Sequence, residues 1–491
     1  MSRAWIPVLT FLLLVIGLSA GMSDDRVIAA SEVLAKIKAG ETAEFDNYTI
    51  VGDLNLSALK IEDAVHFNHT IFQNSVNFNY TSFNGPVYFW SSAFNGPAYF
   101  VSSVFNGPAY FDYSAFTDPA YFGSSAFTGP AYFGSSAFTG PAYFEYSDFN
   151  DSAYFPLSAF NNGAYFQSSA FTGPADFIFS AFNGPADFKF SAFNDGAYFQ
   201  SSAFNGIADF SSSAFNGHAD FRSSAFNDTA DFRYSAFNDI ADLSNSKLKG
   251  DAFFYGSTFK KELDLTLTEY NNLYIRWNKD NRLVYDDTAY QSLIENLRKL
   301  GFTADADNCY YQFRVGQFLH QNPIEDPLIS IFNFGAWIFY GFGKRPIYPF
   351  IWSIFSVGLF GVFWIAIGLA SPMDAISKYN LNKGWSHRLF SLILIPIIFI
   401  VWRMIGLEKS KRAIDEYDQV GNWPTKIREA FGFSATVFLS GTKFFVDPPV
   451  IPVLPGRSQS LIKRTFLLER LLGAFFSILL FLAVGATIVR N

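Results

Sequence analysis

The 491-residue sequence contains a single cysteine, Cys309, and only five histidines. One cysteine excludes an internal disulfide, so any exported part of the chain must be held together by packing and hydrogen bonds. The scattered histidines provide no ligand cluster for a histidine-rich or cysteine-rich metal site. The sequence also shows no nucleophile paired with a base, no paired carboxylates on a recognisable scaffold and no phosphate-binding loop. We therefore expect no enzymatic activity, no catalytic residue, no resident metal and no cofactor.

Basic residues are scarce in one half of the chain. Residues 43–265 carry 22 Asp and Glu against 8 Lys and Arg, a balance of −14, whereas the whole chain has a net charge of −8. The remainder is therefore basic, and it also contains the long apolar runs. An acidic part joined to a basic, hydrophobic part indicates two environments.

Long apolar runs stand at the N-terminus and in the last third of the chain. Residues 1–22 combine one arginine, an apolar run and small residues, which is typical of a secretory signal peptide, with an uncleaved anchor as the alternative. About 20 apolar helical residues cross a hydrocarbon layer of about 30 Å, and this predicts spans at about 347–372 and 468–489. A third span is predicted at 389–407, where Arg403 can reach the interface from one end.

Phenylalanine is abundant, and its 61 residues are not randomly placed. From Phe67 to Phe237 it recurs in alternating steps of five and six residues, and a small or β-branched residue stands two positions before each, as Ala120 does before Phe122. A helical period of 3.6 does not match this spacing. A large inward residue repeated in this way predicts a solenoid, in which each turn buries its core against the turns above and below.

The stretch "AYFGSSAFTGPAYFGSSAFTGPAYF", residues 120–144, resembles the pentapeptide-repeat family, whose pattern is a small residue, any residue, Leu or Phe, and two more. The resemblance implies a right-handed quadrilateral β-helix with one pentapeptide on each side. Every second side carries an extra residue, so a coil takes 22 residues and ten coils are expected. The predicted fold is this solenoid at 43–270, a helical hairpin linker and interfacial segment at 271–342, and an α-helical transmembrane domain at 343–491.

The residue before every second Phe faces outward and changes from Tyr to Asp along the chain. Exposed tyrosines are a candidate aromatic platform for sugars, and stacked aspartates are a candidate ladder for divalent cations, with plainly solvated acid as the alternative. The platform residues are Tyr121, Tyr132, Tyr143, Tyr154 and Tyr165. The ladder residues are Asp187, Asp209, Asp220, Asp231 and Asp242.

The last third resembles the two-helix pore module of potassium-type channels, which consists of a span, a short pore helix, a filter loop and a closing span. "IREAFGFSATVFLSGTKFFVDPP" stands where the pore helix and filter would be, with the helix at 427–442, and "LLERLLGAFFSILLFLAVGATIVR" resembles the closing helix. The segment containing "LIENLRKLG" and "DADNCYYQFR" resembles the connection between pentapeptide repeats and a channel-like region in some archaeal and bacterial proteins. The resemblance also implies a homo-oligomer, usually a tetramer.

The filter itself departs from the pattern of that module. Potassium filters present carbonyls from a Thr-Val-Gly-Tyr-Gly loop. The filter-like residues here are Thr436, Leu439, Ser440, Gly441, Thr442 and Lys443. Potassium selectivity is therefore not implied, and both a non-selective or anion-tolerant pore and a channel fold that no longer conducts are open.

These features predict a multi-pass protein of the cell membrane with an extracytoplasmic solenoid, acting in ion transport or envelope sensing. The alternative is a structural or adhesive envelope protein whose spans serve only as an anchor. The expected partners are the lipid bilayer and a glycan or protein of the envelope. Acidic members of the repeat family imitate DNA, but export argues against any nucleic-acid partner here.

Overall fold

The computed structural model describes residues 26–366, 423–442, 447–451 and 459–488. The chain divides into two compact units, Met1–Phe313 and Arg314–Asn491, and each is described by itself. The predicted signal peptide at 1–22 and the predicted span at 389–407 lie outside the described residues.

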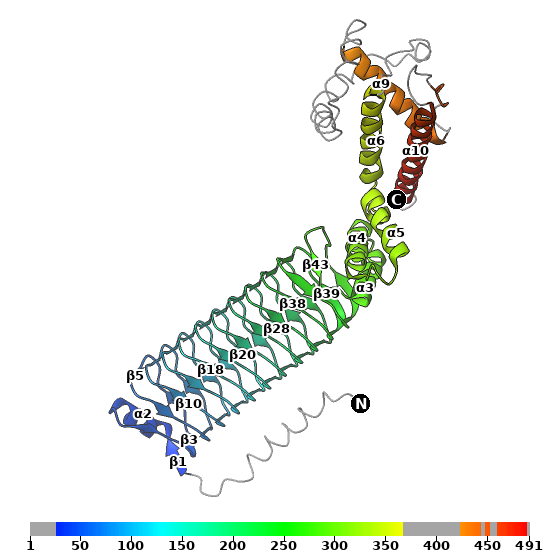
Figure 1. The fold of residues 1–491 in the computed structure, drawn as a ribbon. Helices are drawn as coiled ribbons and strands as arrows, with labels where there is room; N and C mark the ends of the chain where they lie inside the picture. The colour runs from blue at the N-terminus through cyan, green and yellow to red at the C-terminus, as the bar shows by residue number, and fades with distance from the viewer. Residues whose placement is uncertain (1–25, 367–422, 443–446, 452–458, 489–491) are drawn as a thin grey trace. The chain divides into compact units, whose positions relative to one another are not determined.

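The first unit is a solenoid of parallel β-strands, visible as a stack of coils in Figure 1. Each strand pairs with the strand 22 residues further along the chain, as β16 pairs with β20 (Ala142–Tyr143) through Ala120↔Ala142. This register confirms the predicted 22-residue coil. We number the four sides of a coil after four successive strands. Sides 1 to 4 hold β16 (Ala120–Tyr121), β17 (Ala126–Phe127), β18 (Ala131–Tyr132) and β19 (Ala137–Phe138).

The solenoid has about 12 turns, more than the ten counted from the sequence. Side 3 runs without interruption from β2 (Ala43–Glu44) to β43 (Arg282–Leu283) and contains 12 strands. The ten coils predicted from the sequence cover only the part of the chain in which large apolar residues keep the alternating spacing of five and six. Backbone pairing continues beyond that point, through β1 (Arg26–Ala29) at one end and β42 (Glu269–Tyr274) at the other.

Phenylalanine rings fill the interior and stack along the axis. Phe111 and Phe133, on consecutive coils, have ring centroids 4.7 Å apart and planes within 1° of parallel. Rings on different sides meet edge-on, as Phe111 meets Phe122 at 5.5 Å and 87°. These three rings are fully buried, and both stacked and edge-on aromatic pairs add to the free energy gained by burial. The predicted phenylalanine core is confirmed.

Buried hydroxyl groups line the two corners that follow sides 1 and 3. Ser125 is buried, its Oγ donates to Phe100 O, and the same Oγ accepts from Ser103 N at 3.3 Å. The preceding residue, Ser124, has a left-handed backbone with φ 57°, which turns the chain sharply. The hydroxyl is a second donor to Phe100 O, which also accepts from Ser103 N at 3.2 Å, at a corner buried away from water. A serine or threonine repeats this bond every 11 residues along the solenoid.

The hydrogen bonds that flank the strand pairs run in opposite directions on alternate sides. On sides 1 and 3 the flanking N–H groups donate to the next coil, as Phe122 N does to Tyr143 O at 2.7 Å. On sides 2 and 4 the flanking N–H groups donate to the preceding coil, as Ala126 N does to Ser103 O at 2.9 Å. Each coil is therefore both donor and acceptor towards each of its neighbours.

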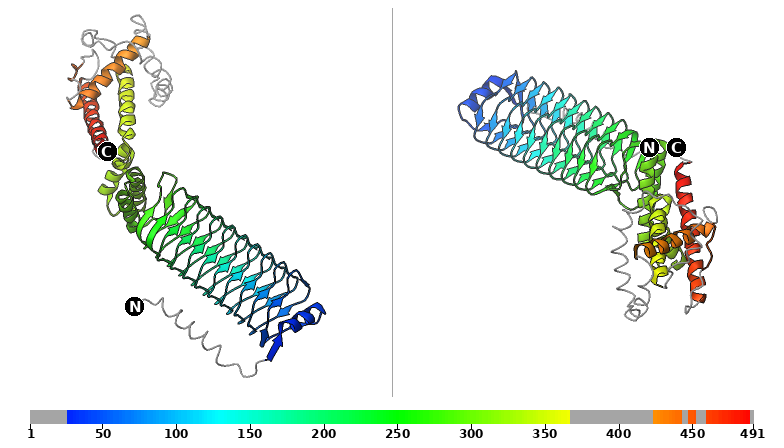
Figure 2. Two further views of the ribbon diagram at one scale, coloured as in Figure 1. Left: turned by 180° about the vertical axis from the view of Figure 1, so that it is seen from behind. Right: turned by 90° about the horizontal axis from the view of Figure 1, so that it is seen from above.

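Helices cover the core at both ends of the coil stack. Figure 2 shows the coils in a row from the blue N-terminal end to the green C-terminal end. At the first end α2 (Ala30–Lys38) buries Val33 against the first coils. At the other end α3 (Asp287–Lys299) buries Leu293 and packs beside β42. Asn296 of α3 accepts from Leu273 N at 3.1 Å and donates to Leu273 O at 2.7 Å. These bonds occupy backbone groups of the last strands that would otherwise be unpaired.

A glycine separates α3 from the next helix, as the apolar spacing predicts. Gly301 has φ +80° and ends the first helix, because a left-handed residue without Cβ closes a helix at little cost. The following helix is α4 (Thr303–His320). Asp305 on α4 forms an ion pair at 2.6 Å with Arg276, which lies just after β42.

The second unit consists of helices. In chain order its described elements are α5 (Pro327–Tyr340), η2 (Gly341–Gly343), α6 (Ile347–Ala366), α9 (Trp423–Leu439), η4 (Ser440–Thr442) and α10 (Gln459–Ile488). Helices α6, α9 and α10 share an apolar core that includes Trp364, Val437 and Phe466. Within the described residues two helices are long and apolar enough to cross a membrane, by length and composition, at Ile347–Ile365 and Gln459–Leu482. They overlap the first and last predicted spans.

Candidate functional site

The outward tyrosines form two stacked ladders on opposite sides of the solenoid. Side 1 carries Tyr99, Tyr121, Tyr143 and Tyr165, and side 3 carries Tyr88, Tyr110, Tyr132 and Tyr154. Neighbouring ring centroids lie 4.9–5.1 Å apart with planes within 10° of parallel. Stacking covers the ring faces, so the ladders present ring edges and hydroxyl groups. The five tyrosines predicted as a platform are therefore divided between two sides, and ring faces are free only at ladder ends.

Burial raises the pKa of two ladder phenols, Tyr132 and Tyr143. Burial raises the pKa of Tyr132, and the adjacent Tyr110 and Tyr154 raise it further. Burial raises the pKa of Tyr143 in the same way, with added contributions from its own stacked neighbours. At neutral pH both ladders are rows of hydroxyls that can donate and accept hydrogen bonds.

The outward aspartates cap turns. Asp187 Oδ1 accepts from Lys189 N at 3.1 Å, and Asp209 Oδ1 accepts from Ser211 N at 2.9 Å. Four further aspartates accept in the same way from the backbone N–H of the residue two positions later. They are Asp176, Asp220, Asp231 and Asp242. Asp is favoured where its side chain can bond its own backbone in this way. The sequence showed the change from Tyr to Asp but not this local role.

Basic side chains neutralise much of the acidic ladder. The ion pairs are Lys189–Asp187 at 2.7 Å, Arg222–Asp220 at 2.7 Å, Arg222–Asp242 at 3.5 Å and Arg233–Asp231 at 2.5 Å. Burial alone would raise the pKa of Asp220, but hydrogen bonds from Arg222 and Gln200 lower it overall. The Asp220 carboxyl is therefore held in its charged form by its partners.

The five aspartates predicted to collect cations lie in two columns, one on each of sides 1 and 3. On side 1 the register places Asp187, Asp209 and Asp231 on consecutive coils, and on side 3 it places Asp220 beside Asp242. In the part of the chain that the structure describes, no group of three or more His, Cys, Asp or Glu side chains is arranged to hold a metal ion. The turns and ion pairs use the oxygens that a divalent cation would need.

The filter-like residues lie at a helix end and in a 3₁₀ turn. Thr436 and Leu439 belong to α9, whereas Ser440, Gly441 and Thr442 form η4. Lys443 lies outside the described residues. Helical backbone directs its carbonyls along the helix axis, unlike the extended loop of a potassium filter, whose carbonyls replace the hydration shell of the ion.

Two glycines allow the filter-like turn to lie directly against α10. A Cβ at Gly473 would collide with the backbone of Phe438, and a Cβ at Gly441 would collide with the backbone of Arg470. Arg470 Nη2 in turn donates to Ser440 O at 3.4 Å. This bond places a guanidinium group beside the turn, where it would oppose the approach of cations.

A buried carboxylate joins the three long helices of the second unit. Glu469 on α10 is 0 % exposed. Its Oε2 accepts from Trp364 Nε1 on α6 at 2.8 Å, and its Oε1 is hydrogen-bonded to Ser434 Oγ on α9. A buried acid is costly unless its oxygens are bonded, so these contacts fix how the helices pack. Sequence analysis missed this residue, whose only signal is a lone acid before an apolar run.

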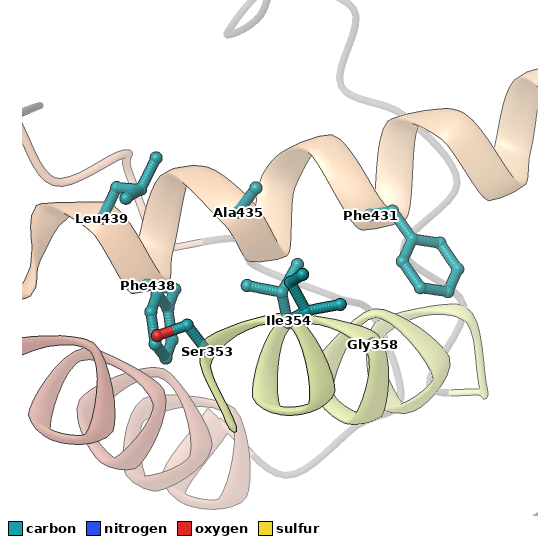
Figure 3. Close-up of a pocket in the computed structure, with 8 residues that line it drawn as sticks. Ser353, Ile354, Gly358, Phe431, Ala435, Phe438 and Leu439 are labelled. Carbon is teal, nitrogen blue, oxygen red and sulfur yellow. The ribbon is translucent and has the colours of Figure 1, made fainter. Parts of the chain in front are cut away.

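An apolar cavity of about 180 Å³ lies between α6 and α9 (Figure 3). It is lined by Ser353, Ile354, Val357, Gly358, Phe431, Ala435, Phe438 and Leu439. The hydroxyl of Ser353 already donates to Pro349 O at 2.7 Å within its own helix. The lining therefore suits hydrocarbon and offers no polar group to orient a reacting ligand.

A family model described as Pentapeptide repeats (9 copies) matches residues 89–136 and 122–169, which form the central coils. No curated protein and no solved structure gives a significant match. For the channel-like module, support is limited to the two apolar helices. The first unit is thus a solenoid of pentapeptide repeats, and the chain continues into helices of which two are long and apolar enough to cross a membrane.

Proposed function

We propose that this protein is a membrane-attached component of the cell envelope. Its solenoid lies outside the cytoplasm and binds a partner of the envelope, while the helices of the second unit hold the protein in the lipid bilayer. The observation that carries this proposal is the contrast between the outward side chains of the two units.

The outward side chains of the solenoid include hydroxyls, turn-capping acids and ion pairs, with single exposed apolar residues such as Phe190 between them, as expected for a surface in water. By contrast, α6 and α10 expose large apolar side chains, among them Ile351, Phe355, Leu471 and Ile478, each 47–59 % exposed. Exposed apolar surface on long helices is stable in lipid or against further subunits. The rigid, repetitive solenoid is suited to presenting binding groups at fixed spacing.

Two measurements test the proposal. Protease added to intact cells should digest the solenoid, and the second unit should remain with the membrane fraction. Replacing residues 343–491 with an unrelated membrane anchor should preserve envelope binding. Protection of the solenoid in intact cells, with digestion only after lysis, would overturn the orientation.

The second candidate function is ion conduction, and it rests on one specific arrangement. The short helix α9 packs against both α6 and α10, an order of long, short and long helix that agrees with the resemblance to two-helix pores. The helical backbone at Ser440 and the guanidinium of Arg470 argue for a pore that is not potassium-selective. Current recordings in planar bilayers and the subunit number in lipid test it together. A tetramer carrying non-selective or anion currents supports conduction, whereas a silent monomer contradicts it.

A further inference from the structure

One corner of the early coils breaks the repeat pattern. Trp90 is the sole tryptophan between residues 43 and 270, and it stands at the corner after side 3. It contacts His69 at 4.7 Å and 87°, and Tyr113 at 5.8 Å and 77°. The indole is 42 % exposed and the Tyr113 ring 47 % exposed.

The geometry of this corner differs from that of the tyrosine ladders. In the ladders each ring face is covered by the next ring, but at the corner the rings meet nearly at right angles. Edge-on contacts cover only part of the ring faces. The corner therefore offers exposed aromatic faces that the ladders do not.

The corner is also held in place by the backbone. Asn68 Oδ1 accepts from Trp90 N at 3.1 Å, and Asp46 accepts from Asn68 N at 2.7 Å and from Asn68 Nδ2 at 3.2 Å. His69 N donates to Trp90 O at 2.8 Å. Trp90 thus sits on a preorganised turn, which reduces the entropy lost when it binds a ligand.

A carboxylate accompanies the rings. Asp112 stands one coil after Trp90 in the same column, and its Oδ1 accepts from Gly134 N at 3.0 Å. A carboxylate accepts several hydrogen bonds, so this one can also receive ligand hydroxyls. The balance of −14 over residues 43–265 disfavours anionic ligands such as nucleic acid or anionic lipid.

We infer that this corner is a binding site for a neutral polysaccharide. The C–H face of a sugar ring packs on the indole of Trp90 and the ring of Tyr113, and sugar hydroxyls donate to Asp112. The coils repeat at about 4.8 Å, comparable to one sugar unit of an extended chain, so a polysaccharide along the axis meets aromatic groups on successive coils. This inference rests on the proposed envelope-binding function and assigns it a ligand class and a place.

The experiment uses the full chain in detergent and measures retention on microcrystalline cellulose and on chitin. We expect the wild type to be retained and Trp90→Ala to bind about tenfold more weakly. Trp90→Phe should recover part of the binding, and Tyr113→Ala should weaken it severalfold. The control is Tyr146→Ala, which is matched to Tyr113→Ala. Tyr146 has the same left-handed backbone as Tyr113, with φ 58° against 59°, but it stands at the opposite corner and is 63 % exposed.

Unchanged retention of Trp90→Ala would overturn this site but leave envelope binding by the solenoid intact. Absence of wild-type retention on both materials would also overturn the inference, and so would Trp90-dependent binding to heparin in place of the neutral polymers. Failure of the anchor replacement or of the protease experiment would instead contradict the proposed function itself. Equal far-UV circular dichroism of all variants shows that the coils remain folded.

Discussion

The buried serine hydroxyls, such as that of Ser125, stabilise the corners of the coils through hydrogen bonds to the backbone. Ser125→Ala removes the hydroxyl that donates to Phe100 O and accepts from Ser103 N, while these two backbone groups keep their bond to each other at 3.2 Å. Loss of such a hydrogen bond costs about 0.5–1.5 kcal/mol. We therefore expect a lower midpoint of thermal unfolding, measured by circular dichroism. Ser124→Ala, at the neighbouring exposed position, is the control and should change little; equal effects of the two changes would contradict the hydroxyl role.

A second residue-scale prediction concerns Glu145. Its Oε2 is buried without a hydrogen-bond partner in the described structure, and burial raises the pKa of its carboxyl. A raised folded-state pKa favours the folded state below the ordinary value of 4.5, and this advantage is lost as the pH rises through the folded-state pKa. Glu145→Gln should therefore raise the unfolding midpoint at pH 7 and lose this advantage below pH 4.5. Asp148→Asn, at an exposed carboxylate, is the control, and a gain for Glu145→Gln that is independent of pH would be inconsistent with this reasoning.

The phenylalanine spacing was sufficient to predict which side chains lie inside, and the 22-residue coil followed from that spacing together with the four sides that the resemblance to pentapeptide repeats implies. The spacing could not predict what the outward and corner residues do. A period indicates whether a side chain faces inward or outward, but not which groups it contacts. Ser125 was interpreted by its size, although its hydroxyl is what the corner requires. Likewise, the tyrosines were predicted to present ring faces, but registered strands stack them so that only their edges are open. Trp90 is the one tryptophan of the repeats and Glu469 lies outside them, so periodicity carried no information on either residue.

At the scale of elements, the contact between α9 and α10 depends on glycine. Gly473→Ala would drive a methyl group into the backbone of Phe438, and overpacking of this kind costs about 1–3 kcal/mol. We expect weaker association of the two helices, measured as a lower unfolding midpoint in detergent. Gly432→Ala is a matched control, because a Cβ there meets nothing within 4 Å. It should be neutral or stabilising, since alanine favours helix over glycine. If both substitutions behave alike, glycine contact does not hold α9 against α10.

The whole solenoid tolerates changes in length only in units of its repeat. Deleting residues 120–141 joins Pro119 to Ala142 and removes one coil, and deleting 120–130 joins Pro119 to Ala131 and removes half a coil. Because each coil contacts only its neighbours, both variants should fold with midpoints close to that of the wild type. The half-coil deletion should also move the early tyrosines to the opposite side relative to the later aspartates.

Deleting residues 120–124 is the control for this experiment, because five residues break the alternating phase and move phenylalanines out of the core. That variant should be rapidly digested by protease, while the 22-residue and 11-residue deletions resist. Equal resistance of all three variants would show that stability does not depend on the phase.

The alternating direction of the hydrogen bonds between coils has an electrostatic consequence. Peptide dipoles in an α-helix add up along the axis. Here the dipoles alternate along each strand, and the flanking bonds of sides 1 and 3 oppose those of sides 2 and 4, so their fields largely cancel. A longer stack of coils accumulates no polarity at its tips. The potential around the rod is then set by its side chains alone, and evolution can lengthen it without altering how its ends attract ions.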